Sequence, residues 1–291
     1  MSLVSSGHVC TFRISIRSIC AIVIPPLIFI VGSLCSSSEG TNDAFTLDSI
    51  RQSLVRQEDT IIFSLIERAK FPINSATYDA SPSSLVHGFP GSLLDFVVRR
   101  TEAVQAKAGR YENPEELPFL LTTLPHPLVP RHNYPQVLYP AAASVNVSKT
   151  ILDMYIQQLL PLFTAEGDDG NYASAAACDL ACLQALSRRI HDGRFVAEVK
   201  FRDAPEDYEP LIRAKDRDAL MKLLTDEKVE EIVKERVRKK AMIFGQEVSL
   251  NDTDSKGNYK VDPSVVSHLY AEWVIPLTKL IEVEYLLRRL D

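Results

Sequence analysis

The sequence predicts an all-α fold in which several helices pack as one bundle. Apolar residues recur at helical spacing through most of the chain beyond residue 40. No run alternates convincingly between apolar and polar residues, as a half-buried strand would. The hydrophobic content of 46% and the charged content of 24% are ordinary for a globular protein, so 291 residues supply ample material for a core.

The spacing of the apolar residues sets the expected helices. They span residues 46–69, 92–110, 149–164, 173–201, 206–223, 227–244 and 263–290. Thr46 or Asp48 can cap the first of them, because a side-chain oxygen at the N-cap accepts a free backbone N–H group. The segment 113–142 is too rich in proline for a regular helix and too apolar for disorder. We expect it to be an ordered connection that packs across the helices.

The N-terminal extension differs from the rest of the chain. Arg13 and Arg17 precede an apolar block at 19–35, and small and polar residues follow it. This order is the layout of a secretory signal, and the block is too short and too broken by proline to predict a spanning helix. We therefore expect a targeting extension, residues 1–39, followed by a single all-helical domain, residues 40–291.

Charge and cysteine content exclude several classes of protein. The 32 basic and 38 acidic residues give a net charge of −6, whereas a general nucleic-acid binder would carry a basic excess. No nucleic-acid partner is therefore expected. Of the five cysteines, only Cys178 and Cys182 lie beyond the extension. They are one helical turn apart without further ligands at suitable spacing, so they predict small core residues and no metal site.

Charged residues interrupt the apolar face of the first expected helix. A ladder with alternating steps of four and three residues runs through Leu47, Arg51, Leu54, Glu58, Ile61 and Leu65. Such a ladder normally faces another helix, and a buried Arg51 or Glu58 would need an oppositely charged partner. The alternative is a slightly rotated helix that lets both charges reach water.

Two cations are aligned in the fourth expected helix. Arg189 and Lys200 are eleven residues apart, which at about 100° per residue is three turns with about 20° left over. If the helix is continuous, both side chains lie on one face; the alternative is two ordinary solvated charges. Gly193 lies between them, where glycine costs about 1 kcal/mol relative to alanine. It would permit a close helix approach that the sequence alone does not show.

The last expected helix repeats this pattern. Thr278 and Glu282 are one turn apart near an apolar stripe, and Pro276 predicts a kink just before them. Taken alone, Glu282 is an ordinary carboxylate at the rim of a bundle. Together, the polar residues in the apolar registers of these helices predict one enclosed pocket. Its expected members are Arg51, Glu58, Arg189, Lys200, Glu230, Thr278 and Glu282.

Two arginines and a lysine in one pocket suit a small dianion, because a guanidinium group binds a carboxylate through two hydrogen bonds. The sequence shows no nucleophile–base arrangement, no glycine-rich phosphate loop and no metal-ligand cluster. The chemistry of such a pocket would therefore rest on binding and charge.

Four blocks of the sequence carry a resemblance to a known family. They are RQSLVRQEDTIIFSLIERAKFP, GDDGNY, LQALSRRIHDGRFVAEVKF and PLTKLIEVEYLLRRLD. They resemble the all-helical chorismate mutases of plants and fungi, the plant forms most closely, and the resemblance covers about residues 46–291. It implies a homodimer of all-α subunits. It also implies the conversion of chorismate to prephenate by an intramolecular Claisen rearrangement in phenylalanine and tyrosine biosynthesis, without a cofactor or a covalent intermediate.

The resemblance also implies roles for the residues of the pocket. Arg51 and Arg189 would bind the two carboxylates of chorismate. Lys200 and Glu282 would flank the ether oxygen, where negative charge builds as the C–O bond breaks. Glu282 can donate a hydrogen bond only when it is protonated, which requires a pKa raised by burial.

Three further positions complete the implied substrate site. Thr278 and Glu230 would lie near the carboxylate and hydroxyl groups of chorismate. Asp226 stands where the fungal enzyme has an asparagine, and an acid there would repel a dianion unless it faces water. This departure from the family pattern leaves the role of Asp226 open.

An effector site for tryptophan, phenylalanine or tyrosine is also implied, at the dimer interface. It would be built from the end of the second helix, residues 109–110, and from the turn and helix start at 167–178. Its candidate residues are Gly109, Arg110, Asn171, Ala173 and Ser174. Regulated relatives have glycine where this chain has Ala173, and one methyl group can block a close backbone approach. Weak or absent regulation is therefore expected.

Two alternatives for function and one for localisation stay open. The chain could be an inactive homologue that serves as a helical binding protein, or an enzyme that acts on another small dicarboxylate. The metabolic role favours the cytosol or the plastid, whereas the layout of the extension favours the secretory route through the endoplasmic reticulum.

Overall fold

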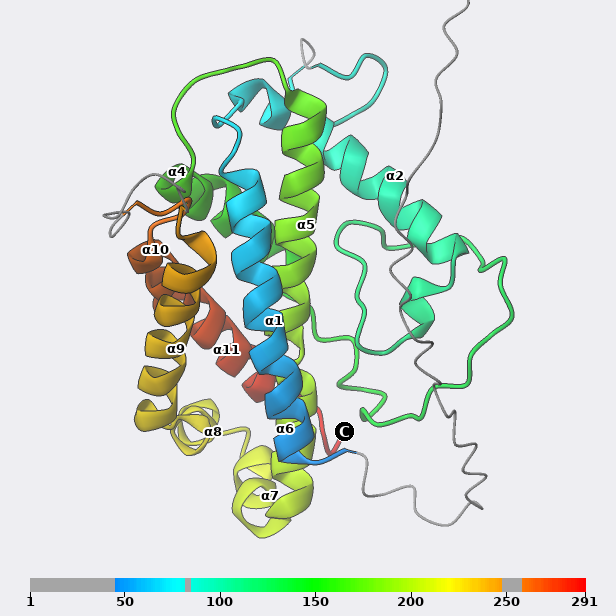
Figure 1. Ribbon diagram of the computed structural model, residues 1–291. Coiled ribbons are helices and arrows are strands. Elements are labelled where there is room, and N and C mark those ends of the chain that lie inside the picture. Colours follow the sequence, from blue (N-terminus) through cyan, green and yellow to red (C-terminus); the bar gives the residue numbers. More distant parts are fainter. Residues whose placement is uncertain (1–44, 82–84, 248–257) are drawn as a thin grey trace, which may run out of the picture. The chain divides into compact units, whose positions relative to one another are not determined.

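Helices make up the regular structure of the chain (Figure 1). The computed structural model describes residues 45–81, 85–247 and 258–291, which belong to one unit, Asn42–Asp291. Within these ranges the only pairing of strand type is an isolated bridge between Gln246 and Tyr259, so the all-α prediction is confirmed. The extension 1–39 lies outside the described residues.

The helices that the structure describes are α1 (Leu47–Arg68), α2 (Leu93–Lys107), α3 (Ser148–Met154), α4 (Leu160–Phe163), α5 (Tyr172–His191), α6 (Gly193–Asp203), α7 (Pro205–Arg213), α8 (Arg217–Leu224), α9 (Glu227–Gly245), α10 (Pro263–Leu269) and α11 (Ile275–Leu287). From α3 to α9 the helices follow one another closely, whereas longer connections join α1 to α2 and α2 to α3. Short 3-10 turns follow α1 and α2, at η1 (Ser75–Tyr78) and η2 (Arg110–Glu112). In Figure 1, α1 lies alongside α5, α2 packs on α5, and α9 packs on α1.

The first helix begins where its cap predicts. The Thr46 hydroxyl accepts the backbone N–H of Ser49 at 3.2 Å, and the Ser49 hydroxyl accepts the N–H of Thr46 at 3.1 Å. This reciprocal pair is a capping box, which satisfies two N–H groups that a helix start leaves free. Ile61, Ile62 and Leu65 are buried against the other helices, so the ladder of the first helix does face inward.

The predicted helix 173–201 is two helices, α5 and α6, that continue in one direction. Irregular geometry is confined to Asp192. The N–H of Asp192 still donates to the carbonyl of Arg188 at 2.9 Å, and the N–H of Val196 donates to the carbonyl of Asp192 at 3.2 Å. Because the hydrogen-bond ladder runs through the irregularity, Arg189 and Lys200 keep a common side.

Gly193 lets α6 approach α11 closely. A Cβ atom added at Gly193 would lie 2.8 Å from the carbonyl oxygen of Thr278 and 3.3 Å from a methyl group of Ile281. A side chain there would push the two helices apart. The unfavourable glycine in mid-helix is thus explained by contact with the helix that carries Thr278 and Glu282.

The predicted single helix 206–223 is wrong, because the chain turns between α7 and α8. Lys215 adopts a left-handed backbone conformation, with φ at 53°. Asp216 then caps α8 by accepting the N–H of Ala219 at 3.0 Å. An aspartate just before a new apolar repeat is an N-cap signal that could have placed this break.

The kink predicted at Pro276 takes the form of a π turn, η4 (Tyr270–Val274), which ends two residues before the proline. A second π turn, η3 (Tyr155–Leu159), ends two residues before Pro161 in the same way. Proline lacks an N–H group and its ring clashes with the carbonyl four residues back. A wider turn just ahead relieves that clash.

The proline-rich connection 113–142 is ordered at its ends. The buried Glu102 carboxylate accepts the N–H groups of Leu120 and Leu121 at 3.0 Å each, and also that of Phe119. Phe119 and Leu138 are buried. The middle of the segment is more exposed, Leu128 being 81% accessible, but its backbone N–H donates to the carbonyl of Lys107 at 2.8 Å, so this part also contacts the end of α2.

Two clusters of buried apolar side chains hold the bundle together. One gathers residues of α1, α2, α5, α9, α10 and α11, including Leu65, Leu183 and Ile281. The other gathers residues of α6, α7, α8 and the end of α11, including Phe195 and Leu286. The site described next is lined by residues that belong to both clusters.

Candidate active site

A cavity of about 450 Å³ lies between α1, α5, α6, α8, α9 and α11. All residues that the sequence predicts for the substrate site line it: Arg51, Arg189, Lys200, Asp226, Glu230, Thr278 and Glu282, together with Glu58. These side chains come from α1, α5, α6, α11 and the start of α9, so they span most of the domain sequence. The fold brings them to one place because α1 and α11 pack on both α5 and α6, and α9 packs on α1.

Arg189 is the most enclosed cation of the cavity, at 6% exposure. Its Nη1 atom lies 3.4 Å from the Thr278 hydroxyl, while its Nε–H group has no hydrogen-bond partner among the described residues. The Thr278 hydroxyl itself donates to the carbonyl of Val274 at 2.6 Å, at the end of the π turn. A guanidinium that lines a cavity and has few hydrogen-bond partners in the protein suits the binding of an anion there.

Lys200 and Glu282 form the polar pair between α6 and α11. Lys200 Nζ donates to Glu282 Oε2 at 3.1 Å and lies 3.5 Å from the carbonyl of Leu224. Burial raises the pKa of Glu282 above its ordinary value, and the positive charge of Lys200 opposes that rise. The structure thus supports the direction of the pKa shift that the sequence analysis requires.

Glu58 has partners that the sequence does not identify. Arg236 on α9 binds both carboxylate oxygens, with Nε at 2.9 and 3.2 Å, and Lys240 Nζ lies 3.0 Å away. The Glu58 side chain is only 1% exposed. The alternative that Glu58 reaches water is therefore wrong, and the carboxylate is neutralised by α9.

Arg51 lies at the open side of the cavity. Its side chain is 57% exposed, and its Nη1 atom lies 3.6 Å from Asp48. This arrangement agrees in part with the solvated alternative, since Arg51 lines the cavity and also reaches water. A substrate could bind this guanidinium without breaking a buried contact.

The two acids on α9 are held in different ways. Glu230 pairs with Lys279 of α11 at 2.8 Å. Asp226 is exposed and caps α9, accepting the N–H groups of Lys228 and Val229 at 3.1 and 3.2 Å. Its charge is directed to a helix N-terminus, where the helix dipole stabilises an anion.

Sequence reasoning missed Lys279, Arg236 and the apolar lining of the cavity. Lys279 is three residues before Glu282, a spacing that shares a helix face and could have identified it. Arg236 could not be found this way, because its partner lies 178 residues away. Val196, Ile275 and other apolar residues line the remaining wall, which limits the access of water.

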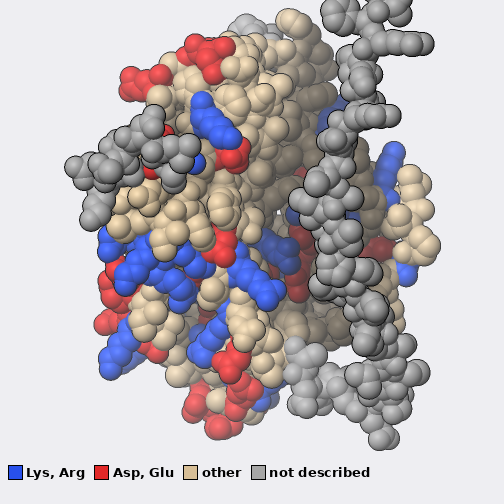
Figure 2. All heavy atoms as spheres, viewed as in Figure 1, with Lys and Arg blue, Asp and Glu red and all other residues tan. Residues whose placement is uncertain are grey.

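The charge of the face shown in Figure 2 contrasts with the net charge of the chain. Lys and Arg side chains gather over α9, and acidic side chains gather over α7. Positive charge close to a site attracts an anionic ligand even when the whole protein is acidic.

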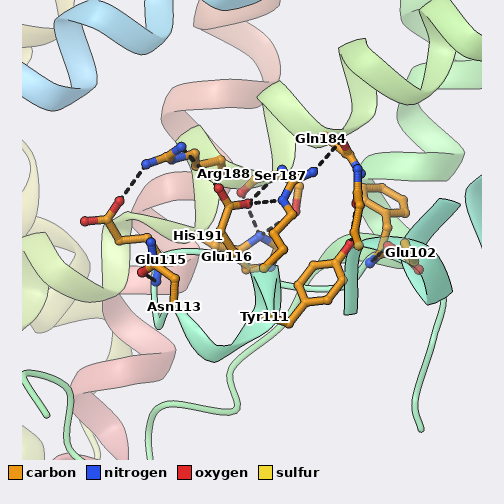
Figure 3. Close-up of polar contacts among 12 residues, drawn as sticks. Glu102, Tyr111, Asn113, Glu115, Glu116, Gln184, Ser187, Arg188 and His191 are labelled. Carbon is orange, nitrogen blue, oxygen red and sulfur yellow. Dashed lines mark hydrogen bonds and ion pairs between the residues drawn. The ribbon is translucent and has the colours of Figure 1, made fainter. Parts of the chain in front are cut away.

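The candidate effector residues lie in two groups in one subunit. Gly109 is left-handed, with φ at 83°, and Arg110 binds Glu116 at 2.8 Å and Gln184 at 3.0 Å. Figure 3 shows that Glu116 also meets Arg188 of α5. The first group thus lies at the end of α2 and beside the second half of α5.

The other candidates lie at the start of α5. Asn171 precedes the helix and donates to Asp169 at 2.9 Å, while Ala173 and Ser174 are exposed. Gln184 is eleven residues further along α5 than Ala173, which is about 16 Å at 1.5 Å per residue. The structure therefore does not bring the two groups together within one chain.

Other site types find no support in the described residues. None of their His, Cys, Asp and Glu side chains gather in a group of three that could hold a metal ion. Cys182 is buried and Cys178 is half-buried, in agreement with small core residues. In the described ranges, no helix has the length and apolarity to cross a membrane.

Comparison with known proteins decides the family. The family model described as chorismate mutase type II matches residues 171–283. Over 258 residues the chain is 64% identical to chorismate mutase 2 of Arabidopsis thaliana, an alignment that covers 88% of this chain and 97% of that protein. The chain belongs to the chorismate mutase family. It is also 53% identical to the cytosolic chorismate mutase 2 of Zea mays, over 86% of this chain and 98% of that protein.

Solved chorismate mutases share the fold. The crystal structure of AtCM1 with tyrosine bound in its allosteric site aligns with a TM-score of 0.77 at 49% identity, over 87% of this chain and 99% of that one. The chloroplast chorismate mutase from Zea mays aligns with the same TM-score and coverage at 50% identity. Chorismate mutases are isomerases, and the activity of this chain is that of its family. The alternatives of an inactive homologue and of a different dicarboxylate enzyme are not favoured.

Proposed function

We propose that the cavity between α1, α5, α6, α9 and α11 binds chorismate and converts it to prephenate. Arg51 and Arg189 bind the two carboxylates of the substrate, and Lys200 and Glu282 donate hydrogen bonds to its ether oxygen. The observation that carries this proposal is the part-buried Lys200–Glu282 pair, which lines the same cavity as the guanidinium of Arg189. These groups face the same cavity.

The charges of the cavity suit a dianionic substrate. Five cationic side chains and four carboxylates line it. The lining carries a net charge of +1 with Glu282 ionised, and of +2 in the protonated state that the proposed mechanism requires. That charge balances the two carboxylates of chorismate. Asp226 opposes binding little, because it is exposed and directed to the start of α9.

The proposed mechanism needs no covalent step. Binding of both carboxylates holds the substrate in the compact chair from which it rearranges, and such positioning can supply several kcal/mol of a barrier. As the C–O bond breaks, negative charge builds on the ether oxygen. Lys200 and protonated Glu282 are already directed to that charge in an enclosed site, where fixed donors stabilise it more than water does.

Thr278 and Glu230 are proposed to complete the substrate site. The Thr278 hydroxyl lies beside Arg189 Nη1 and fixes that end of the guanidinium. Glu230 is held by Lys279 and lies on the α9 wall, where a carboxylate can accept a hydrogen bond from the substrate hydroxyl.

We also propose that the chain works as a homodimer. The two groups of candidate effector residues lie about 16 Å apart along α5, so a single chain does not form one effector site. A second copy against α2 would supply the missing half. The exposed Val104 on α2 and the exposed Leu128 and Val129 beside it, at 67%, 81% and 45% exposure, support an apolar contact there.

Within the family, solved structures carry tyrosine at an allosteric site. For this chain, we propose that the effector site responds weakly or not at all, because the methyl group of Ala173 hinders a close backbone approach.

We also propose that residues 40–291 form the catalytic domain and that the enzyme works in the cytosol or the plastid. Cytosolic and chloroplast relatives support this localisation, and their names give no support to the secretory alternative.

The proposed function is tested by mixing the protein with chorismate and following chorismate loss and prephenate formation. We expect rapid conversion by the unchanged protein, and a loss of at least about 100-fold in kcat for Lys200→Ala and for Glu282→Ala, the scale of removing one electrostatic donor. Glu247→Ala, which removes an exposed carboxylate that does not line the cavity, is the control. Full activity of both cavity variants would contradict the proposed roles.

A further inference from the structure

We propose that Glu198 and Tyr285 are positioning residues that set the orientation of Lys200 toward Glu282. They form a buried clasp between α6 and α11, on the side of α6 away from the cavity. The clasp is defined by Glu198, Tyr285 and Arg289. This inference rests on the proposed roles of Lys200 and Glu282 and adds residues that do not line the cavity.

Glu198 is the centre of the clasp. Its side chain is fully buried, and Oε2 accepts the Tyr285 hydroxyl at 2.6 Å. Arg289 binds both oxygens, with Nε at 2.7 Å and Nη2 at 3.2 Å, and Arg202 Nε donates at 2.6 Å. A buried carboxylate with this many donors holds a fixed place, because the loss of one donor leaves charge poorly compensated.

Residues 289–291 and the loop that contains Tyr139 make further contacts with the clasp. The Tyr285 hydroxyl accepts the backbone N–H of Tyr139 at 2.8 Å, and the Tyr139 hydroxyl donates to the carbonyl of Asp291 at 2.8 Å. The Arg289 guanidinium lies 4.7 Å from the ring centres of Tyr139 and of Phe201. The last residues of the chain thus fasten α11 to α6.

Two contacts join α6 to α11: the clasp and the Lys200–Glu282 pair. Glu198 and Lys200 are two residues apart, so they leave α6 about 200° from each other. Glu282 and Tyr285 are three residues apart and share one face of α11. Lys200 reaches α11 at Glu282, and Glu198 reaches it at Tyr285. Two contacts on opposite sides of a helix fix its rotation about its own axis.

That rotation decides where Lys200 Nζ lies. With side chains, a helix has a radius of about 6 Å, so a rotation of about 10° moves the tip of a side chain by about 1 Å. A displacement of about 1 Å at a reacting centre can lower a rate about 100-fold. The clasp therefore acts on catalysis through the position of Lys200, without contact to the substrate.

The first test is Tyr285→Phe in the full chain, which removes one hydroxyl and keeps the ring. We expect kcat to fall about 10- to 100-fold while KM changes less than about threefold, because Arg51 and Arg189 still bind the carboxylates. Glu284→Gln is the matched control on the same helix. Glu284 pairs with Arg217 and Arg288 outside the cavity, and we expect its variant to keep kcat within about twofold.

A double-mutant cycle separates positioning from general damage. In a Lys200→Ala background, Tyr285→Phe should cost less than about twofold, because the group that it positions is gone. In an Arg51→Ala background, it should keep its full cost. Equal costs in both backgrounds would overturn the proposal.

Amide hydrogen exchange of residues 193–203 gives a readout besides activity. We expect Tyr285→Phe to speed exchange in α6 by at least about threefold and to leave α2 unchanged. Unchanged exchange in α6, or a kcat within about twofold of the original, would overturn the clasp. Full activity of Lys200→Ala would contradict the proposed role of Lys200. The exchange data would still show whether the clasp stabilises α6.

Discussion

At the scale of single residues, the buried carboxylates differ in the number of hydrogen-bond donors that bind them. Glu58 is bound by Arg236 and Lys240, and Glu198 by Arg289, Arg202 and Tyr285, so each is saturated with donors. Glu282 faces a cavity and has the single partner Lys200 among the side-chain contacts described. When a buried carboxyl group has few donors, burial favours its protonated form.

The titration of Glu282 predicts the pH dependence of the enzyme. Burial raises the pKa of Glu282, and the protonated form is the one that donates, so activity should fall as pH rises through that raised pKa. Glu282→Gln carries an amide that donates at every pH. We expect this variant to keep substantial activity and to lose the alkaline fall in a kcat profile measured from pH 5 to about pH 9. An unchanged profile would count against a protonated Glu282.

At the scale of elements, close contact between α6 and α11 shapes the site. Gly193 has no side chain that would separate the helices, and a π turn precedes Pro276 just before α11. Sequence periodicity predicted the helices themselves, and Pro276 predicted a disturbance before Thr278. It did not predict a π turn, because a helix accommodates a proline by a simple kink or by a π turn, and the spacing of apolar residues does not distinguish the two.

Gly193→Ala tests the contact between these helices. Alanine gains about 1 kcal/mol of helix propensity, but its methyl group would lie 2.8 Å from the Thr278 carbonyl oxygen. Overpacking of this kind typically costs about 1–3 kcal/mol. We expect a net loss of up to about 2 kcal/mol in the free energy of unfolding and a fall of about tenfold or more in kcat.

Gly245→Ala is the control for that variant. Its added methyl group would meet its nearest neighbour at 3.6 Å, an ordinary contact, at the end of α9. We expect stability within about 0.5 kcal/mol and activity within about twofold of the original protein. Denaturant unfolding and the chorismate assay measure both variants. If Gly193→Ala had the same stability and activity as Gly245→Ala, the close approach of α6 to α11 at Gly193 would not be needed.

At the scale of the whole molecule, one subunit contains every proposed catalytic residue but only separated parts of the proposed effector site. The catalytic cavity lies between the two apolar clusters of one chain. The effector candidates lie at the end of α2 and the start of α5. The proposed catalytic site therefore lies within one chain, whereas the proposed effector site would require a second copy.

A tryptophan titration tests that regulation. We expect the rate of prephenate formation to stay within about twofold, because the methyl group of Ala173 hinders a close backbone approach. Ala173→Gly is the matched variant and should gain a response, since it removes the methyl group that is proposed to hinder the backbone approach. Activation of the unchanged enzyme by several-fold would show that Ala173 does not block the site.

The sequence by itself determined the helical class, most helix positions and the shared face of Arg189 and Lys200, because these depend on local spacing along one chain. Only the tertiary structure decided the partners of Glu58, the contact of Gly193 with Thr278 and the clasp of Glu198 with Tyr285. These contacts join residues that are about 80 to 180 positions apart. Helical periodicity shows which side of a helix faces inward, but it carries no information on which other helix will lie there.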